Sequence, residues 1–266
     1  MIPTRDGFEL VVLDWAGTVV DFGCQAPVIA LRDAFARRAV RISEAQARRD
    51  MGKAKQEHVR ALLADAEVAG AWLAARGCMP GEADVAGLMN DLGPLMRDQA
   101  ARAAQLIDGA KSTIDELRRR GIKIASSTGY TRDMMQPVLR EAARQGYVPD
   151  HLVCSGETPM GRPSPLMIYK ACADLGVWPL QRVVKVDDTE AGVAEGRNAG
   201  CFTVGLSASG NSVGLTQEAL AALPAADRAQ RLAAAKQALL NAGADVVIDS
   251  IADLLAVLSG FHRDLA

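Results

Sequence analysis

Short apolar segments rich in β-branched residues alternate with helical segments along most of this chain. Each apolar segment has the length of a buried strand and ends in Gly, Ser, Thr or Asp. The predicted strands are 8–14, 122–129, 152–156, 183–189, 201–205 and 244–249. The helical patterns between them are 110–120, 132–145, 165–175 and 190–199. Such alternation predicts an α/β fold with a doubly wound, mostly parallel sheet.

A long helical segment interrupts this alternation after the first strand. Its helical patterns are 26–38, 44–51, 56–75 and 82–105, with no convincing strand among them. We interpret residues 23–100 as an inserted helical cap domain, and residues 1–22 and 101–266 as the catalytic core. A cap at this point of the chain can close over a substrate at the sheet edge and exclude water.

Composition limits the class of partner. The chain has 266 residues, of which 49% are hydrophobic, so it can bury a large core, and disorder is excluded as its main state. The formal net charge is −2 and the basic residues are scattered, which argues against nucleic acid and favours a small-molecule partner. We find no signal peptide and no apolar run of membrane length, and therefore expect a cytoplasmic protein.

Two further segments carry less information. The five cysteines are widely spaced and form no CxxC pair, so neither a disulfide framework nor a zinc site is expected. Residues 207–243 begin with a Ser/Gly-rich loop and continue into an Ala/Leu/Gln-rich helix without a clear chemical motif.

Polar residues stand at the ends of three predicted strands, namely Asp14, Thr128 and Asp188. In parallel sheets, ligands bind beyond the carboxyl ends of the strands, so these side chains should meet in one crevice. A carboxylate at a strand end can act as a nucleophile on phosphorus if a cation neutralises the repulsion. An aspartate in such a place can also be only a turn or capping residue.

The strand ends resemble the four motifs of the haloacid dehalogenase superfamily. Segment 14–18 (DWAGT) resembles the first motif, DxxGT, and Thr128-Gly129 resembles the second. Arg162, which precedes a Pro-rich helix start, resembles the third motif, and segment 187–189 (DDT) the fourth. The resemblance implies a Rossmann-like core of this superfamily, with the predicted helical insert as its cap.

The same resemblance assigns roles to these residues. It implies that Asp14 is the nucleophile and that Thr128 and Arg162 bind the phosphoryl group. It also implies a Mg²⁺ cofactor held by Asp14, the carbonyl of Ala16 and Asp188. Most phosphatases of the superfamily carry a general acid two residues after the nucleophile, whereas this chain has Ala16 there. An ester phosphatase is therefore disfavoured.

Segment 51–58 (MGKAKQEH) in the predicted cap resembles the part of the phosphonoacetaldehyde hydrolase family that carries a Schiff-base lysine. An iminium between lysine and a substrate aldehyde is an electron sink, so a carbon leaving group can depart as an enamine. The alignment puts Lys55 in this role rather than Lys53. Lys55 and His58 are one helical turn apart, which makes His58 a candidate for proton transfer. Cys24, Met51, Gly129 and Tyr130 match positions that line the family's pocket.

The fourth motif departs from the family pattern. An acid expected in many superfamily members, four residues after the metal ligand, falls on Gly192. Asp188 aligns with the metal ligand itself and Asp187 is its rival. Either Asp187 or Glu190 is a possible substitute for the missing acid.

The resemblance implies hydrolysis of the C–P bond of phosphonoacetaldehyde to acetaldehyde and phosphate, through a lysine imine and an aspartyl phosphate. It also implies a homodimer formed through the cap. One alternative is a phosphatase or phosphomutase of the same superfamily that acts on a small phosphate ester. The other is a non-catalytic binding protein on this scaffold, which the filled nucleophile, metal and phosphate positions disfavour.

Overall fold

The computed structural model describes residues 7–263, and within them six strands form one sheet in which every pairing is parallel. The strand order is β3-β2-β1-β4-β5-β6. The strands are β1 (Leu10–Leu13), β2 (Lys123–Thr128), β3 (His151–Cys154), β4 (Val183–Asp187), β5 (Phe202–Leu206) and β6 (Val246–Ile248). Each predicted apolar segment overlaps one of them, although β3 begins one residue earlier and β5 ends one residue later than predicted. The predicted parallel α/β sheet is confirmed.

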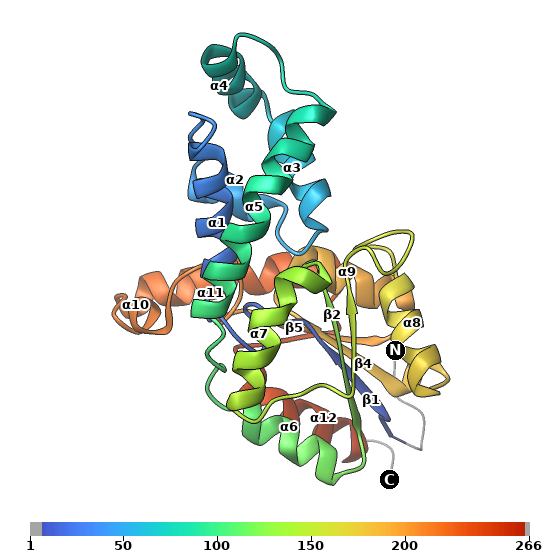
Figure 1. The fold of residues 1–266 in the computed structure, drawn as a ribbon. Helices are drawn as coiled ribbons and strands as arrows, with labels where there is room; N and C mark the ends of the chain where they lie inside the picture. The colour runs from blue at the N-terminus through green and yellow to red at the C-terminus, as the bar shows by residue number, and fades with distance from the viewer. Residues whose placement is uncertain (1–6, 264–266) are drawn as a thin grey trace.

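Helices cover both faces of the sheet (Figure 1). Along β1, Val11 and Leu13 belong to one apolar core and Leu10 and Val12 to another, because successive residues of a strand point to opposite faces. The first core is closed by α6 (Ala110–Arg119), α7 (Arg132–Arg144) and α12 (Leu254–Arg263). On the other face lie α8 (Leu166–Leu175), α9 (Glu190–Ala199) and α11 (Ala225–Ala242). Burial on both faces explains why the strands are apolar throughout.

Between β1 and β2 the described chain forms α6 and, before it, five helices that lie beyond one edge of the core (Figure 1). They are α1 (Gln25–Ala36), α2 (Glu44–Arg49), α3 (Lys55–Ala64), α4 (Ala66–Arg76) and α5 (Glu82–Arg102). They enclose apolar side chains of their own, among which the rings of Phe35 and Trp72 meet edge to face at 6.4 Å. We call these five helices the cap. The exact division at residues 22/23 and 100/101 stays a prediction.

The single predicted helix 56–75 is wrong. It is divided at Asp65, whose backbone is extended (φ −65°, ψ 131°) and whose carboxylate accepts hydrogen bonds from the N–H groups of Glu67 and Val68. Asp65 therefore ends α3 and caps α4. The apolar periodicity runs on through this position, so the pattern alone did not reveal the break.

Two connections join the cap to the core, and they lie side by side. Val20 forms an antiparallel bridge with Leu106, and the N–H of Ile107 donates to the carbonyl of Val19 at 2.8 Å. In the first connection, both carboxylate oxygens of Asp21 accept hydrogen bonds from the start of α1, at Gln25 and Ala26. The cap is thus attached at one point of the sheet edge, directly after the strand that carries Asp14.

The segment 207–243 contains two helices rather than the single helix predicted for it. A loop after β5 leads to α10 (Gln217–Ala221), and α11 follows. Two short 3₁₀ helices complete the described chain, η1 (Leu180–Arg182) and η2 (Ile251–Asp253). Each of the five cysteines, all in the described part, is free. Between residues 7 and 263, no helix has the length and apolar character needed to cross a membrane.

Candidate active site at the carboxyl edge of the sheet

A small cavity lies between the carboxyl edge of the sheet and the cap. It is lined by every residue predicted for the site except His58 and Asp188, and also by Pro27, Gly52 and Thr189. Strand ends and cap therefore contribute side chains to the same small space. Its lining is Asp14, Ala16, Cys24, Pro27, Met51, Gly52, Lys55, Thr128, Gly129, Tyr130, Arg162 and Thr189.

Asp14 follows directly after β1 and is held by a cation. Its Oδ1 lies 2.8 Å from Nη1 of Arg162, and both side chains are buried. Burial, and then repulsion by Asp187, outweigh the opposing effect of Arg162, so that the pKa of Asp14 is raised to about 6. Above that pH, Asp14 is an anion fixed at the wall of the cavity.

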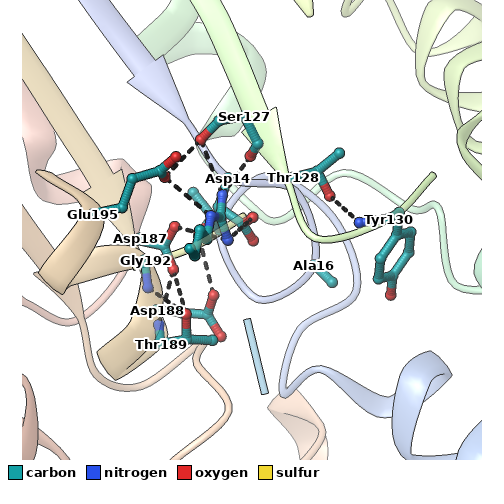
Figure 2. Close-up of polar contacts among 12 residues, drawn as sticks. Asp14, Ala16, Ser127, Thr128, Tyr130, Asp187, Asp188, Thr189, Gly192 and Glu195 are labelled. Carbon is teal, nitrogen blue, oxygen red and sulfur yellow. Dashed lines mark hydrogen bonds and ion pairs between the residues drawn. The ribbon is translucent and has the colours of Figure 1, made fainter. Parts of the chain in front are cut away.

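Arg162 is the centre of a buried polar network. Its acidic partners Asp14, Asp187 and Glu195 lie close together in Figure 2. Besides Asp14, its Nη1 contacts Asp187 at 3.3 Å, its Nε contacts Glu195 at 3.0 Å, and its Nη2 donates to Ser127. Burial alone would lower the pKa of Arg162. The carboxylates of Asp187, Asp14 and Glu195 outweigh this effect, so the pKa of Arg162 is raised. All three nitrogens are thus engaged by protein groups.

A second buried cation, Lys185, completes this network and was not predicted from the sequence. Its Nζ lies 2.8 Å from Ser127 Oγ, 3.0 Å from Asp187 and 3.2 Å from Glu195. Lys185 and Glu195 are both fully buried. The sequence does hold a signal for Lys185, because a charged residue is unusual inside a strand that is buried on both faces. Lys185 also stands two residues before Asp187, so both side chains point to the same face of the sheet.

Asp188 lies beneath the turn at Gly17 and Thr18, which follows Asp14, rather than in the cavity wall. Its Oδ2 accepts the backbone N–H of Asn211 at 2.8 Å, and its Oδ1 lies 3.4 Å from Thr18 Oγ1. Gly17 has φ +79°, and a Cβ there would lie only 2.2 Å from Oδ2 of Asp188. Glycine is therefore required at this turn on two grounds, its conformation and its contact with Asp188.

The carboxylates of Asp14, Asp187 and Asp188 can bring one oxygen each within 4.8 Å of one another. Asp188 has no ion-pair partner among residues 7–263, and burial together with repulsion by Asp14 and Asp187 raises its pKa well above the usual value. In this buried part of the described chain, four carboxylates (these and Glu195) meet two cations, Arg162 and Lys185. When all four are ionised, they carry two more charges than these two cations, and an all-oxygen set of this kind fits a hard divalent cation.

The position of Asp187 explains Gly192, where the fourth motif departs from the family pattern. A Cβ placed on Gly192 would lie 2.0 Å from Cγ of Asp187, so the Asp187 carboxylate already fills the space of a side chain there. Thr189 donates to Oδ1 of Asp187 from both its N–H and its hydroxyl. Glu190 is exposed, and it is Asp187 that lies in the acid cluster.

Lys55 is the first residue of α3, and its side chain is buried in the cavity. Nζ lies 5.2 Å from the centre of the Tyr130 ring and 3.9 Å from Sδ of Met51. Burial lowers the pKa of Lys55 to about 8; Cys24 and Asp14 oppose this, and Arg162 adds to it. A substantial share of the amine is therefore neutral near pH 8, as a nucleophilic lysine requires.

The remaining predicted residues surround Lys55 and the strand ends. His58 is fully buried one turn after Lys55, and burial and the Lys55 charge hold its pKa well below 6.5. The thiol of Cys24 donates to the Ala16 carbonyl at 3.6 Å. Thr128 accepts the N–H of Tyr130 at 3.2 Å, which leaves the Thr128 hydroxyl proton for a ligand.

Lys53, the competing lysine, lies differently. Its Nζ pairs with Asp50 at 2.5 Å, and its side chain is 37% exposed. Its backbone carbonyl, not its amine, approaches the site, because a Cβ on Gly129 would lie 2.6 Å from that oxygen. The absence of a side chain at Gly129 thus lets the cap loop rest on the end of β2.

Comparisons with known proteins agree with this geometry. A family model described as haloacid dehalogenase-like hydrolase matches residues 8–200. A protein named phosphonoacetaldehyde hydrolase from Syntrophobacter fumaroxidans is 48% identical over 94% of this chain and 90% of its own. One of the same name from Paraburkholderia phytofirmans is 44% identical over 97% of each chain. The crystal structure of a phosphonoacetaldehyde hydrolase-like protein from Oleispira antarctica has a TM-score of 0.96 and 40% identity, covering 100% of this chain and 96% of that one.

Proposed function

The chain belongs to the haloacid dehalogenase-like hydrolases and, among them, to the phosphonoacetaldehyde hydrolase family, and from this premise we propose that it hydrolyses phosphonoacetaldehyde through a Lys55 imine. The family expected from the motifs is confirmed by the comparisons. The observation that carries the mechanism is the buried amine of Lys55, which shares a small cavity with the carboxylate of Asp14.

The first step joins substrate and cap. The neutral amine of Lys55 adds to the aldehyde carbon and water leaves, giving a protonated imine. The depressed pKa of Lys55 supplies the neutral amine. Neutral His58, one turn away, is suited to exchange protons during this step.

The second step breaks the C–P bond. Oδ1 of Asp14 is held by Arg162, so Oδ2 attacks phosphorus. The electron pair of the C–P bond passes to the imine, which becomes an enamine. A proton added to the enamine carbon restores the imine, and water then releases acetaldehyde and the free amine of Lys55.

The third step restores the nucleophile. Water hydrolyses the aspartyl phosphate, which frees phosphate and the Asp14 carboxylate. The hydroxyl of Thr128 is placed to donate to a phosphoryl oxygen throughout. We propose Mg²⁺ as the cofactor, held by Asp14, the Ala16 carbonyl and Asp188, where it would neutralise charge between the nucleophile and the phosphoryl group.

A phosphatase or phosphomutase acting on a small phosphate ester is the second candidate. An alcohol leaving group needs a proton, and the methyl side chain of Ala16 cannot supply one. A carbon leaving group bound as an imine has no such need. The position of Ala16 in the cavity wall therefore favours the C–P substrate.

The direct test is incubation with phosphonoacetaldehyde and Mg²⁺, with separate assays for acetaldehyde and phosphate. Equal amounts of both products are expected. A panel of small phosphate esters serves as the comparison, and turnover of an ester in preference to phosphonoacetaldehyde would favour the second candidate. Phosphate binding without any turnover would favour a non-catalytic protein.

We also propose that the protein is a cytoplasmic homodimer formed through the cap. Leu73 on α4 and Met79 after it are 44% and 60% exposed, and apolar side chains of this kind suit a subunit contact. Light scattering should give about twice the mass of one chain. Replacing both residues with serine should shift the protein towards the monomer.

A further inference from the structure

Arg48 fastens the cap to the core at a point outside the cavity. It lies on α2, and its side chain is only 12% exposed. Nη1 donates to the carbonyl of Gly23 at 2.9 Å and to Oδ1 of Asn211 at 3.2 Å. Nη2 donates to the carbonyl of Gly214 at 2.9 Å. The guanidinium therefore joins a cap helix to the first connection and to the loop that follows β5.

Asn211 connects Arg48 to Asp188, which belongs to the acid cluster of Asp14, Asp187 and Asp188. Its side chain is bonded to Arg48 in both directions, because Nδ2 also donates to the Arg48 carbonyl at 3.1 Å. Its backbone N–H donates to Oδ2 of Asp188 at 2.8 Å. One residue thus links the cap helix α2 to the carboxylate that has no ion-pair partner among residues 7–263.

The loop around Asn211 is packed so closely against Asp188 that a shift of the loop must also shift Asp188. The Ser209 hydroxyl donates to the carbonyl of Gly17 at 2.7 Å, and the Gly23 N–H donates to the Ser209 carbonyl at 2.8 Å. A Cβ at Gly210 would lie 2.9 Å from Cβ of Asp188. The loop is therefore packed against the nucleophile turn, the first connection and Asp188 at once.

We infer that Arg48 and Asn211 are positioning residues that couple closure of the cap to the orientation of Asp188. Opening the cap about its two connections would withdraw Arg48, which would release the Asn211 side chain and loosen the loop that holds Asp188. The acid cluster would then be complete only when Lys55 lies over the cavity. By reciprocity, a divalent cation bound at Asp188 would favour the closed cap.

This inference rests on the metal site of the proposed function, but it does not need the imine chemistry. The first measurement is therefore Mn²⁺ binding by calorimetry, without substrate. Arg48→Met and Asn211→Ala should each weaken binding about five- to tenfold, within the usual range of coupling between sites. The double variant should be no weaker than either single variant, since both remove the same link.

Arg49→Met is the matched control. Arg49 lies on the same helix, but its ion pair is with Asp65 inside the cap, at 2.9 Å. Its Mn²⁺ affinity should equal that of the unchanged protein. Thermal unfolding identifies any variant that fails to fold, and Arg48→Lys, which can keep one of the contacts, should then show an intermediate affinity.

The second measurement is hydrogen exchange with and without Mn²⁺. In the unchanged protein, Mn²⁺ should protect α2 and the two connections, and this protection should be lost in Asn211→Ala. Normal Mn²⁺ affinity in both folded variants would overturn the coupling and leave the proposed function intact. Failure of the unchanged protein to bind Mn²⁺ would overturn the metal site, and the coupling with it.

Discussion

Nη1 of Arg162 lies 2.8 Å from Oδ1 of Asp14, in a site where both side chains are buried. The carboxylate of Asp14, which we propose as the nucleophile, is therefore oriented by the protein before substrate arrives. The same guanidinium also contacts Asp187, Glu195 and Ser127, so a bound phosphoryl group must exchange with one of these partners to reach it. The predicted role of Arg162 in phosphoryl binding stays a prediction, whereas its contact with Asp14 is a feature of the structure.

Asp14→Asn should reduce turnover by a factor of about 10³ or more, because the amide has nearly the same shape but cannot attack phosphorus. Circular dichroism should still report a folded protein. The measurement is phosphate release from phosphonoacetaldehyde. Mass spectrometry must show that the asparagine has not deamidated. Near-normal activity in such a preparation would remove Asp14 from the nucleophile role.

Lys185→Met should destabilise the protein by about 3 to 5 kcal/mol, the usual cost of removing one partner from a buried charge network. The variant leaves Asp187 and Glu195 with one cation fewer in a site without solvent. Urea unfolding measures the effect. Lys170→Met is the control, because Lys170 pairs with Asp174 at the surface of α8 and its loss should change stability little. Equal effects of the two changes would contradict the buried network.

The parts of this site that the sequence predicted are those carried by local patterns. The β-branched segments predicted the strands, and their polar ends predicted Asp14, Thr128 and Asp188, since parallel strands bring their carboxyl ends to one edge. The role of Lys55 was predicted from segment 51–58, in which the residues on both sides of the lysine also match the family motif. Each of these signals lies within a few residues of the side chain concerned.

The parts that the sequence did not predict depend on contacts between distant segments. Glu195 looks like any acid on a helix until α9 packs against β4 and brings it to Lys185. Asn211 is one polar residue in a loop, and its role arises only from Arg48, 163 positions away. The fact that the Asp187 carboxylate fills the space of a side chain at Gly192 is likewise visible only in the folded chain.

Removal of divalent cations should silence the enzyme, and Mg²⁺ should restore it. The surplus negative charge of Asp14, Asp187 and Asp188 is then left uncompensated, so the nucleophile and an anionic substrate repel each other. Activity is measured in excess chelator and again after Mg²⁺ is added back. Zn²⁺ should be a poor substitute, because the site offers oxygen ligands only. Full activity in excess chelator would rule the metal out.

Reductive trapping of the imine should depend on pH with a midpoint near 8. The pKa of Lys55 is lowered to about 8, so the reactive neutral amine increases as the pH rises from 7 to 9, whereas an ordinary lysine would need a pH above 10. The rate of adduct formation with acetaldehyde and cyanoborohydride, followed by mass spectrometry, gives the profile. An exposed lysine such as Lys111 serves as the internal reference. The same midpoint for both residues would show that burial does not activate Lys55.

Borohydride added with phosphonoacetaldehyde or acetaldehyde should leave a permanent adduct on Lys55, and Lys55→Arg should be inactive because guanidinium keeps the charge but forms no imine. Lys53→Arg is the matched control two residues away, and its effect should be mild, since Lys53 is partly exposed and paired with Asp50. Peptide mapping distinguishes the two sites. An adduct on Lys53 would overturn the alignment of the cap motif but spare the mechanism. If no adduct forms and Lys55→Arg remains fully active, the imine mechanism fails, and the phosphate-ester alternative becomes the better account of a cavity that still holds Asp14 and Arg162.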